Sequence, residues 1–317
     1  MKEIGGYFSL EEFVNNEFYP NLIALNSCRN AFLYLIRALD YQKVYLPFLL
    51  CDSMAQVCRN EGVEVEFYSI DKNFLPVFSR PIENNEVLLV VNYYGQLTDQ
   101  NVNKLKKNYK NIILDNTQAF FQQPIDGVDT IYSCRKFFGV PDGAYLASKC
   151  KSKEALLPDM SKDRMIALLG RYEDSASAYY EAFKASEYSI EIAPLKVMSK
   201  LTKNLLAAID YEKVRKKRNA NFTFLYNALR DYNQITVQTP DGPFAYPFIV
   251  KDGLQVRKKL AKLKIYIPLL WPNVMQSTSP DSLEYHYAAN ILPLPCDQRY
   301  DEGDMEYIIV SLLSFVK

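Results

Sequence analysis

Short apolar strands and helices alternate along the first third of the chain, and this alternation limits the fold more than any other feature. The strands are predicted at residues 43–47, 63–70, 86–95 and 111–115, and the helices between them at 50–62 and 102–110. Strands that alternate with helices at this rhythm are typical of βαβ units. We therefore predict an α/β fold with a mostly parallel central sheet that is flanked by helices.

The pattern changes near Lys151. Residues 161–193 are polar, aromatic and helical, Pro194 interrupts them, and a second helical stretch covers residues 195–232. Further strands are predicted at 235–238, 245–250 and 264–270, and further helices at 253–263 and from Asp304 onward. This mixture predicts a smaller α+β domain that follows the sheet domain.

Two limits of the large domain can be placed from these patterns. We put the boundary near residue 200, which gives a large domain over 1–200 and a small domain over 201–317. At the other end, residues 1–20 are predicted to be irregular apart from one short helix, Ser9–Phe13. Ser9 and Glu12 have the spacing of a capping box at its start.

The charges of the chain balance. Lys and Arg number 37, Asp and Glu number 37, and the formal net charge is zero. A balanced chain has no electrostatic footprint for nucleic acid and no polybasic segment for a membrane surface. The basic run Lys213–Arg218 is accordingly predicted to be a solvated helix face. Apolar runs such as Val87–Val91 are far too short to span a bilayer, and the acidic N-terminus is unlike a secretion signal.

Cysteine and histidine usage limits the chemistry. The six cysteines are scattered without a CxxC pair, which predicts reduced thiols in a cytoplasmic protein, not a disulfide framework or a zinc site. One histidine, His286, is present, so multi-histidine metal centres are excluded and we expect no metal. His286 lies among tyrosines and is predicted to be a surface or packing residue. Catalysis would have to come from carboxylates, amines, hydroxyls or a cofactor.

Polar residues stand where two strands of residues 111–145 end. The apolar run 112–114 stops on Asp115, and a second run, 130–132, stops on Ser133 with Lys136 three residues later. Residues at the carboxyl ends of parallel strands face the ligand crevice, so these three side chains are predicted to converge. The trio suits pyridoxal 5′-phosphate: an acid for the ring nitrogen, a hydroxyl for the phosphate and an amine for the Schiff base.

A helix start upstream could complete such a site. The apolar positions of residues 28–39 repeat at helical spacing, with Asn26 or Ser27 as the N-cap. Free backbone N–H groups and a hydroxyl at a helix start can bind an anion such as phosphate. Taken alone, the same pattern favours a plain N-cap over an anion site.

These motifs resemble the DegT/DnrJ/EryC1/StrS family of fold-type I, pyridoxal-phosphate-dependent sugar aminotransferases. The segment Asp115–Ala119 (DNTQA) is similar to the family's acid motif, and Ser133, Lys136 and the turn Pro141–Gly143 follow in the family's order. The segment Asn26–Ala31 resembles its phosphate-binding helix start. The resemblance covers about residues 20–310.

The resemblance implies a role for each matching residue. Lys136 would form the Schiff base and Asp115 would bind the ring nitrogen, and these two are the predicted catalytic residues. Gln118 would bond the 3′ oxygen of the ring, and Ser133 would bind the phosphate. The predicted cofactor-binding residues are Ser27, Cys28, Arg29, Cys51, Asp115, Gln118, Ser133 and Lys136.

The chain departs from the family at three points. The family usually places its phosphate-binding serine five residues before the lysine, whereas Ser133 precedes Lys136 by three. The turn at Pro141–Gly143 lacks the full run of glycines. An aromatic residue often stacks on the cofactor in this family, and the matching position here is Cys51, so Tyr93 or Tyr94 could supply the ring.

The family's chemistry implies transfer of an amino group from glutamate to a nucleotide-linked keto sugar. Two alternatives stay open: a dehydratase or lyase that uses the same residues, and a non-catalytic scaffold of the same fold. Trp271 and Arg299 resemble C-terminal positions near the pocket. Ser199 and Thr202 align with a segment that reaches the cofactor of the neighbouring subunit, which implies a homodimer.

Overall fold

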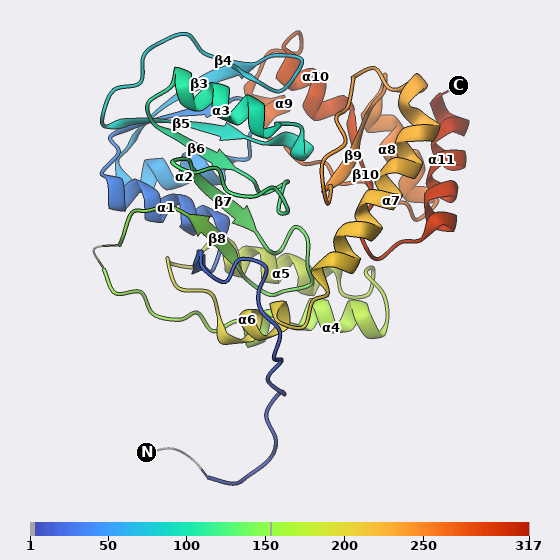
Figure 1. Cartoon of the computed structure of the whole chain (residues 1–317). Helices are drawn as coiled ribbons and strands as arrows, with labels where there is room; N and C mark the ends of the chain where they lie inside the picture. The colour runs from blue at the N-terminus through green and yellow to red at the C-terminus, as the bar shows by residue number, and fades with distance from the viewer. Residues whose placement is uncertain (1–3, 153, 317) are drawn as a thin grey trace.

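The computed structural model describes residues 4–152 and 154–316, and its centre is one eight-stranded sheet (Figure 1). In spatial order the strands are β1 (Ile23–Leu25), β8 (Ala144–Ala147), β7 (Asp129–Ser133), β6 (Ile112–Asp115), β5 (Glu86–Val91), β2 (Lys43–Pro47), β3 (Glu64–Ile70) and β4 (Pro76–Val77). The predicted α/β class and mostly parallel sheet are confirmed.

Strand direction places the important strand ends on one edge of this sheet. β3, β2, β5, β6 and β7 pair in parallel, and β8 is antiparallel to both β7 and β1, so β1 runs with the parallel set. The carboxyl ends of β1, β5, β6 and β7 therefore lie together. The start of β8 joins them, because Ser133 pairs with Ala144.

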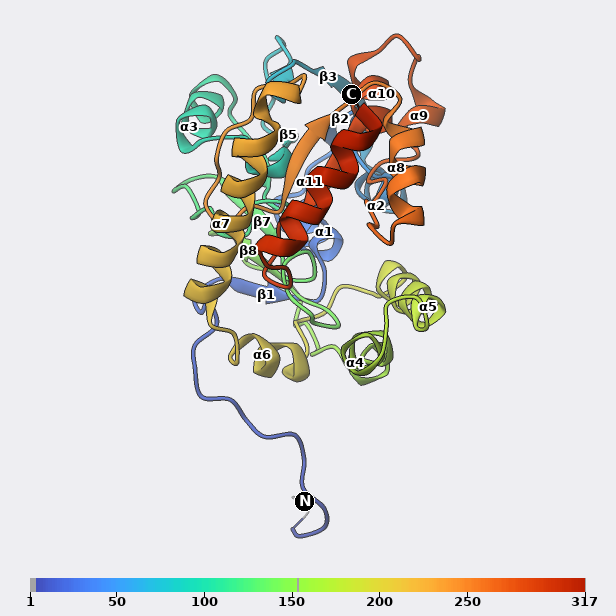
Figure 2. The same ribbon diagram turned by 90° about the vertical axis from the view of Figure 1, so that its right-hand side faces the viewer.

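Helices cover both faces of the sheet. α3 (Asp99–Asn108) lies on one face, and α1 (Cys28–Leu39) and α2 (Asp52–Glu61) lie on the other (Figure 2). α1 contacts β7 and β8 and buries Phe32 and Leu35. It begins as predicted, since the Ser27 side chain accepts a hydrogen bond from the Asn30 N–H.

A helical segment follows β8. It contains α4 (Ile166–Glu173), α5 (Tyr180–Glu191) and α6 (Lys200–Leu206), which lie at the foot of Figure 1. Between α5 and α6 the chain runs beside β1, where the Met198 N–H donates to the Ala24 carbonyl at 3.2 Å. The predicted helical stretch 195–232 is therefore two helices, α6 and α7 (Tyr211–Leu229).

The C-terminal lobe has a core of its own. It contains α7, the antiparallel pair β9 (Ala245–Ile249) and β10 (Ile291–Pro295), and the helices α8 (Gly253–Lys262) and α11 (Glu302–Val316). Its buried core extends from Phe222 to Leu312, while Leu206 of α6 belongs to an aromatic core of the large lobe. The helices α9 (Val274–Ser277) and α10 (Leu283–Asn290) bury their apolar residues in the core of the large sheet instead. The domain boundary near residue 200 stays a prediction.

Three predicted elements are wrong. Ser9–Phe13 is not helical but irregular, and its last residues bind α6: the Phe13 N–H donates to Asn204 Oδ1, and Asn204 Nδ2 donates to the Glu11 carbonyl, both at 2.8 Å. A single turn needs tertiary packing to be stable, and here Leu10 and Phe13 are exposed. Residues 235–238 and 264–270 are irregular, not strands. The partner of β9 is β10, which was not predicted because it contains two prolines. Prolines are nevertheless tolerated in edge strands.

The basic run of α7 is only partly the solvated face that was predicted. Arg218, its last residue, is 2% exposed and belongs to the protein interior. Within the described residues, no helix is long and apolar enough to cross a membrane.

Candidate active site

The thiol of Cys28 marks the point where the predicted site residues meet. Cys28 is the first residue of α1, directly after β1, and its Sγ accepts a hydrogen bond from Thr117 Oγ1 at 3.4 Å. Thr117 in turn donates its backbone N–H to Asp115 Oδ1 at 2.9 Å. The loops that follow β1 and β6 are thus joined at the carboxyl edge of the sheet.

The electrostatics of Cys28 bring in the loop after β7. Burial raises the pKa of the Cys28 thiol to about 12, and the charge of Asp115 adds to the rise. Hydrogen bonds with Thr117 and Ser133 and the positive charge of Lys136 act in the opposite direction on the same pKa. Asp115, Ser133 and Lys136 therefore all influence the pKa of one thiol, and their roles in binding a cofactor stay predictions.

Asp115 is a buried carboxylate with little hydrogen bonding. It is 4% exposed, and within residues 4–152 and 154–316 only Thr117 donates to it. Burial raises the pKa of Asp115, and the hydrogen bonds from Thr117 offset part of that rise. A carboxylate has room for about four hydrogen bonds. Asp115 therefore has hydrogen-bond acceptor capacity left for a cationic donor.

Gln118 is buried, and a backbone hydrogen bond orients its side-chain amide. Its Oε1 accepts the Tyr94 N–H at 2.7 Å, which leaves the Nε2 donor for a ligand. Tyr94 has φ of 54°, a left-handed conformation that is uncommon outside glycine. The bond to Gln118 helps to hold that conformation.

The start of α1 supplies hydrogen-bond donors. The Ser27 side chain caps the helix through the Asn30 N–H at 3.2 Å. The N–H groups of the next two residues, Cys28 and Arg29, have no acceptor inside the helix, as at every helix start. These N–H groups, together with the buried Ser133, are donors of the kind that bind an anion.

Lys136 is exposed, in contrast to the acid and the hydroxyl. Its loop is a tight turn, in which the N–H groups of Phe137 and Phe138 donate to the Cys134 carbonyl at 3.0 and 2.9 Å. For an amine that forms a Schiff base, the sequence predicts burial and activation by a neighbouring cation, Arg135. That expectation is wrong, because the Arg135 guanidinium is paired with Glu187 of α5.

Arg29 and Cys51 lie at the margin of this group. The Arg29 guanidinium donates to the Ile190 carbonyl of α5. Cys51 is the exposed N-cap residue of α2, and its Sγ lies 3.0 Å from Ser53 Oγ. Their roles in cofactor binding stay predictions.

The aromatic residues proposed for ring stacking are occupied by packing. Tyr93 and Tyr94 are each 1% exposed, and their ring centroids lie 5.5 and 6.0 Å from that of Trp271. Neither ring presents an open face to a cofactor, and Trp271 is part of the same buried cluster. Arg299, the other C-terminal candidate, is paired with Asp297 at 2.7 Å.

The role of Asp142 could not be predicted from the residues around it. This fully buried acid accepts the Ser199 N–H at 2.9 Å, the Ser199 hydroxyl at 2.8 Å and the Thr202 hydroxyl. Ser199 and Thr202, expected to reach a neighbouring subunit, are therefore bound within their own chain. Thr117 was also missed, although it lies inside the DNTQA motif.

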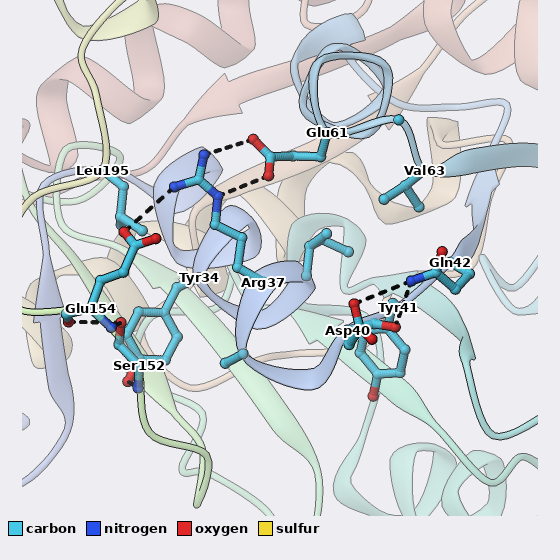
Figure 3. Close-up of a pocket in the computed structure, with 13 residues that line it drawn as sticks. Tyr34, Arg37, Asp40, Tyr41, Gln42, Glu61, Val63, Ser152, Glu154 and Leu195 are labelled. Atoms are coloured by element: carbon cyan, nitrogen blue, oxygen red, sulfur yellow. Dashed lines mark hydrogen bonds and ion pairs between the residues drawn. The ribbon is translucent and has the colours of Figure 1, made fainter.

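A cavity of about 340 Å³ lies elsewhere, at the amino end of β2 (Figure 3). Arg37 and Glu61 form a two-bond ion pair across its wall, at 2.8 Å for each bond. This edge of the sheet is opposite to the one that carries Asp115 and Ser133. Within the described part of the chain, no cluster of three or more His, Cys, Asp or Glu side chains could hold a metal ion.

Solved structures share this architecture. The DegT DnrJ EryC1 StrS aminotransferase from Brucella abortus has a TM-score of 0.60 and 14% identity, with 93% of this chain and 86% of that one covered. The sugar aminotransferase CalS13 from Micromonospora echinospora has a TM-score of 0.61 and 12% identity, with 93% and 88% covered. NtdA from Bacillus subtilis with bound cofactor PMP has a TM-score of 0.65 and 14% identity, with 93% and 73% covered.

The chain has the fold of the DegT/DnrJ/EryC1/StrS aminotransferases. The fold that the motifs implied is thus confirmed. The sequence matches no protein-family model and no curated protein. Identities of 12–14% establish a shared fold alone, so the chemistry has to be inferred from the residues at the sheet edge.

Proposed function

We propose that this protein is a pyridoxal-5′-phosphate-dependent aminotransferase that acts on a sugar. One observation carries the proposal: Asp115 and Ser133 end neighbouring strands at the carboxyl edge of the sheet, Thr117 joins Asp115 to Cys28 at the start of α1, and Lys136 follows Ser133 by three residues. A fold alone hosts many functions, but this set of groups has the composition that the cofactor requires.

The groups of the site fit the cofactor in charge and in hydrogen bonding. Asp115 is buried and under-bonded, so a protonated ring nitrogen would satisfy it and reverse the rise of its pKa. Gln118 keeps a free amide donor for the ring oxygen. Ser27, Ser133 and the first N–H groups of α1 would hold the phosphate.

Each residue would then have a defined task. Bound pyridoxal phosphate supplies an electron sink for the carbon that carries the amino group. Asp115 keeps the ring nitrogen protonated and fixes its orientation. Lys136 attaches the cofactor through its amine and, once released, moves a proton to and from the substrate carbon.

The substrate is proposed to be a nucleotide-linked keto sugar, with glutamate as amino donor. CalS13, which shares the fold, is a sugar aminotransferase, and Helicobacter pylori PseC, another structure with this fold, is an aminotransferase involved in the biosynthesis of pseudoaminic acid. A panel of nucleotide-linked keto sugars, assayed with glutamate, would identify the acceptor.

Cofactor binding can be tested directly. The purified protein with added pyridoxal phosphate should be yellow, and Lys136→Ala should lose the colour. Lys149→Ala, which changes an exposed lysine paired with Asp126, is the matched control and should keep it. Colour without a half-reaction on glutamate would favour the dehydratase or lyase. No colour at any cofactor concentration would contradict the proposal and favour a scaffold.

The same proposal includes a homodimer in the cytoplasm. Large apolar side chains are exposed along the segment between β8 and α6: Leu157, Met160, Ile166, Leu169, Tyr172, Tyr180, Phe183, Tyr188 and Ile192. An apolar surface of this extent is typical of an interface, and the six free thiols fit a reducing compartment. Sedimentation should show a dimer that Leu169→Glu with Tyr172→Glu dissociates, whereas Tyr307→Glu on α11 should leave it intact.

A further inference from the structure

Arg218 of α7 is a buried cation whose hydrogen bonds all go to uncharged oxygens. It is 2% exposed, and its Nε donates to Gln298 Oε1 at 2.8 Å. Its Nη1 donates to the Pro243 carbonyl at 2.8 Å and its Nη2 to the Phe137 carbonyl at 3.1 Å. Burial lowers the pKa of Arg218 to about 10.

The acid nearest in sequence to Gln298 does not neutralise this cation. Asp297 raises the pKa of Arg218, but its two oxygens are bound by the Arg299 guanidinium at 2.7 and 2.8 Å. Burying a cation without a bound carboxylate costs free energy, and an apolar side chain of similar volume would often be more stable. Stability alone is therefore a poor reason for an arginine at this position.

The geometry of the Phe137 carbonyl offers a better reason. It accepts a second hydrogen bond, from Gln298 Nε2 at 2.8 Å, so Arg218, Gln298 and the carbonyl form a closed ring of hydrogen bonds. The guanidinium carbon of Arg218 also lies 4.5 Å from the centroid of the Phe137 ring. Arg218 and Gln298 thus hold the Phe137 carbonyl, and Arg218 also contacts the Phe137 ring. We call this arrangement the clamp.

Lys136 immediately precedes this clamped residue. The Phe137 N–H is bound as well, to the Cys134 carbonyl at 3.0 Å, so both polar groups of residue 137 are fixed. The two side-chain donors come from the C-terminal lobe, one from α7 and one from the segment after β10. The lysine side chain itself is exposed, so its backbone is the part of it that the protein holds.

We propose that Arg218 and Gln298 are positioning residues for Lys136. They fix the backbone from which the Lys136 side chain projects. Because both residues belong to the C-terminal lobe, they also link the position of that lobe to the position of the Lys136 amine. The inference rests on the proposed function, because it gives Lys136 a carbonyl to react with. A small displacement of a reacting group is enough to slow a reaction strongly.

Gln298→Glu separates positioning from stability. The glutamate would still accept from Arg218 and would give the cation a carboxylate, but it would lose the N–H donor to the Phe137 carbonyl. Arg218→Lys is a second variant, since a single ammonium cannot reach three diverging acceptors. Arg215→Gln is the control: Arg215 lies three residues earlier on the same helix and pairs with Asp241 and Glu212.

The readout is the rate at which Lys136 is trapped. Each variant would be incubated with pyridoxal phosphate and reduced with borohydride, and the phosphopyridoxyl group at Lys136 quantified by peptide mass spectrometry against the other lysines. We expect Gln298→Glu to slow trapping at Lys136 by about tenfold or more without lowering the thermal midpoint. Arg215→Gln should match the wild type. Trapping of Gln298→Glu at the wild-type rate would overturn the inference.

A second measurement keeps the inference separate from the proposed function. If wild-type Lys136 is trapped no faster than surface lysines, the proposed function fails, and the clamp is judged by hydrogen exchange of the amides of residues 134–140. Exchange in this loop should be about tenfold faster in Gln298→Glu than in the wild type if the clamp fixes its backbone. Unchanged exchange would refute the clamp in that case.

Discussion

Asp115 and Asp142 are buried acids at the same edge of the sheet, one at the end of β6 and the other in the turn before β8. Asp142 accepts three hydrogen bonds, which come from Ser199 and Thr202 and use both of its oxygens. Asp115 accepts only from Thr117 among the described residues. Equal burial thus accompanies very unequal hydrogen bonding.

The pKa values do not distinguish the two acids. Burial is the largest cause of a raised pKa at both Asp115 and Asp142. The difference lies in the donors, because buried polar groups in folded proteins are normally satisfied. Asp142 is satisfied by its own chain and ties α6 to the sheet edge, whereas Asp115 has acceptor capacity left for a ligand.

The largest expected effect that tests this contrast is on activity. Asp115→Asn removes the negative charge that would hold the ring nitrogen protonated, so amino transfer should fall by about 10²-fold or more. Because the carboxylate is under-bonded, the free energy of unfolding should stay the same or rise. Single-turnover rates with glutamate and urea unfolding would measure the two quantities. Wild-type rates in this variant would remove Asp115 from the site.

The reverse outcome is expected for the other acid. Asp142→Asn turns one acceptor oxygen into a donor that faces the Ser199 or Thr202 donors, and the free energy of unfolding should fall by about 2–3 kcal/mol. Activity per folded molecule should change little, since Asp142 is assigned no contact with substrate. If this variant is stable but inactive, the division between a structural and a ligand-binding acid is wrong.

A smaller loss is expected at the partner of Asp142. Ser199 caps α6 through the Thr202 N–H at 3.1 Å and also donates to Asp142 at 2.8 Å. Ser199→Ala removes the cap and one of three donors, so urea unfolding should show a loss of about 1–2 kcal/mol. Thr117→Ser, which keeps a hydroxyl beside Cys28, is the matched conservative change at the other acid and should cost less.

Much of the fold and part of the site could be predicted because their signals are local. The period of the apolar residues defines the strands, and a strand-end rule places Asp115 and Ser133 on one edge. Ser27 was predictable as an N-cap from its residue type and its place before an apolar period.

The remaining features depend on contacts between distant residues. Asp142 is bound by residues 57 and 60 positions away, and Arg218 reaches a carbonyl 81 positions away. Nothing near Arg218 distinguishes it from the exposed basic residues of the same run. The exposure of Lys136 likewise follows from how the loop after β7 is held, not from the residues beside it.

The smallest expected effect is a difference in how stability depends on pH. The ordinary pKa of an aspartate is near 3.8, and the folded-state pKa of both Asp115 and Asp142 lies above it. Between the unfolded and folded pKa values the folded state binds more protons, so stability is lost as the pH rises through that window. The lowered pKa values of Asp159 and Asp297 act below 3.8, outside this window.

Urea unfolding between pH 4 and pH 7 should therefore show a decline in the wild type that is reduced in both Asp115→Asn and Asp142→Asn. Pyridoxal phosphate sharpens the comparison, because pairing of Asp115 with a cationic ring lowers its pKa and removes its share of the decline. The part of the decline in stability that is due to Asp142 should persist when the cofactor is present. If the cofactor instead abolishes the part of the decline that is due to Asp142 and leaves the part that is due to Asp115, then Asp142 is the acid that meets the ligand, since a bound cation counteracts the effect of burial on a carboxylate.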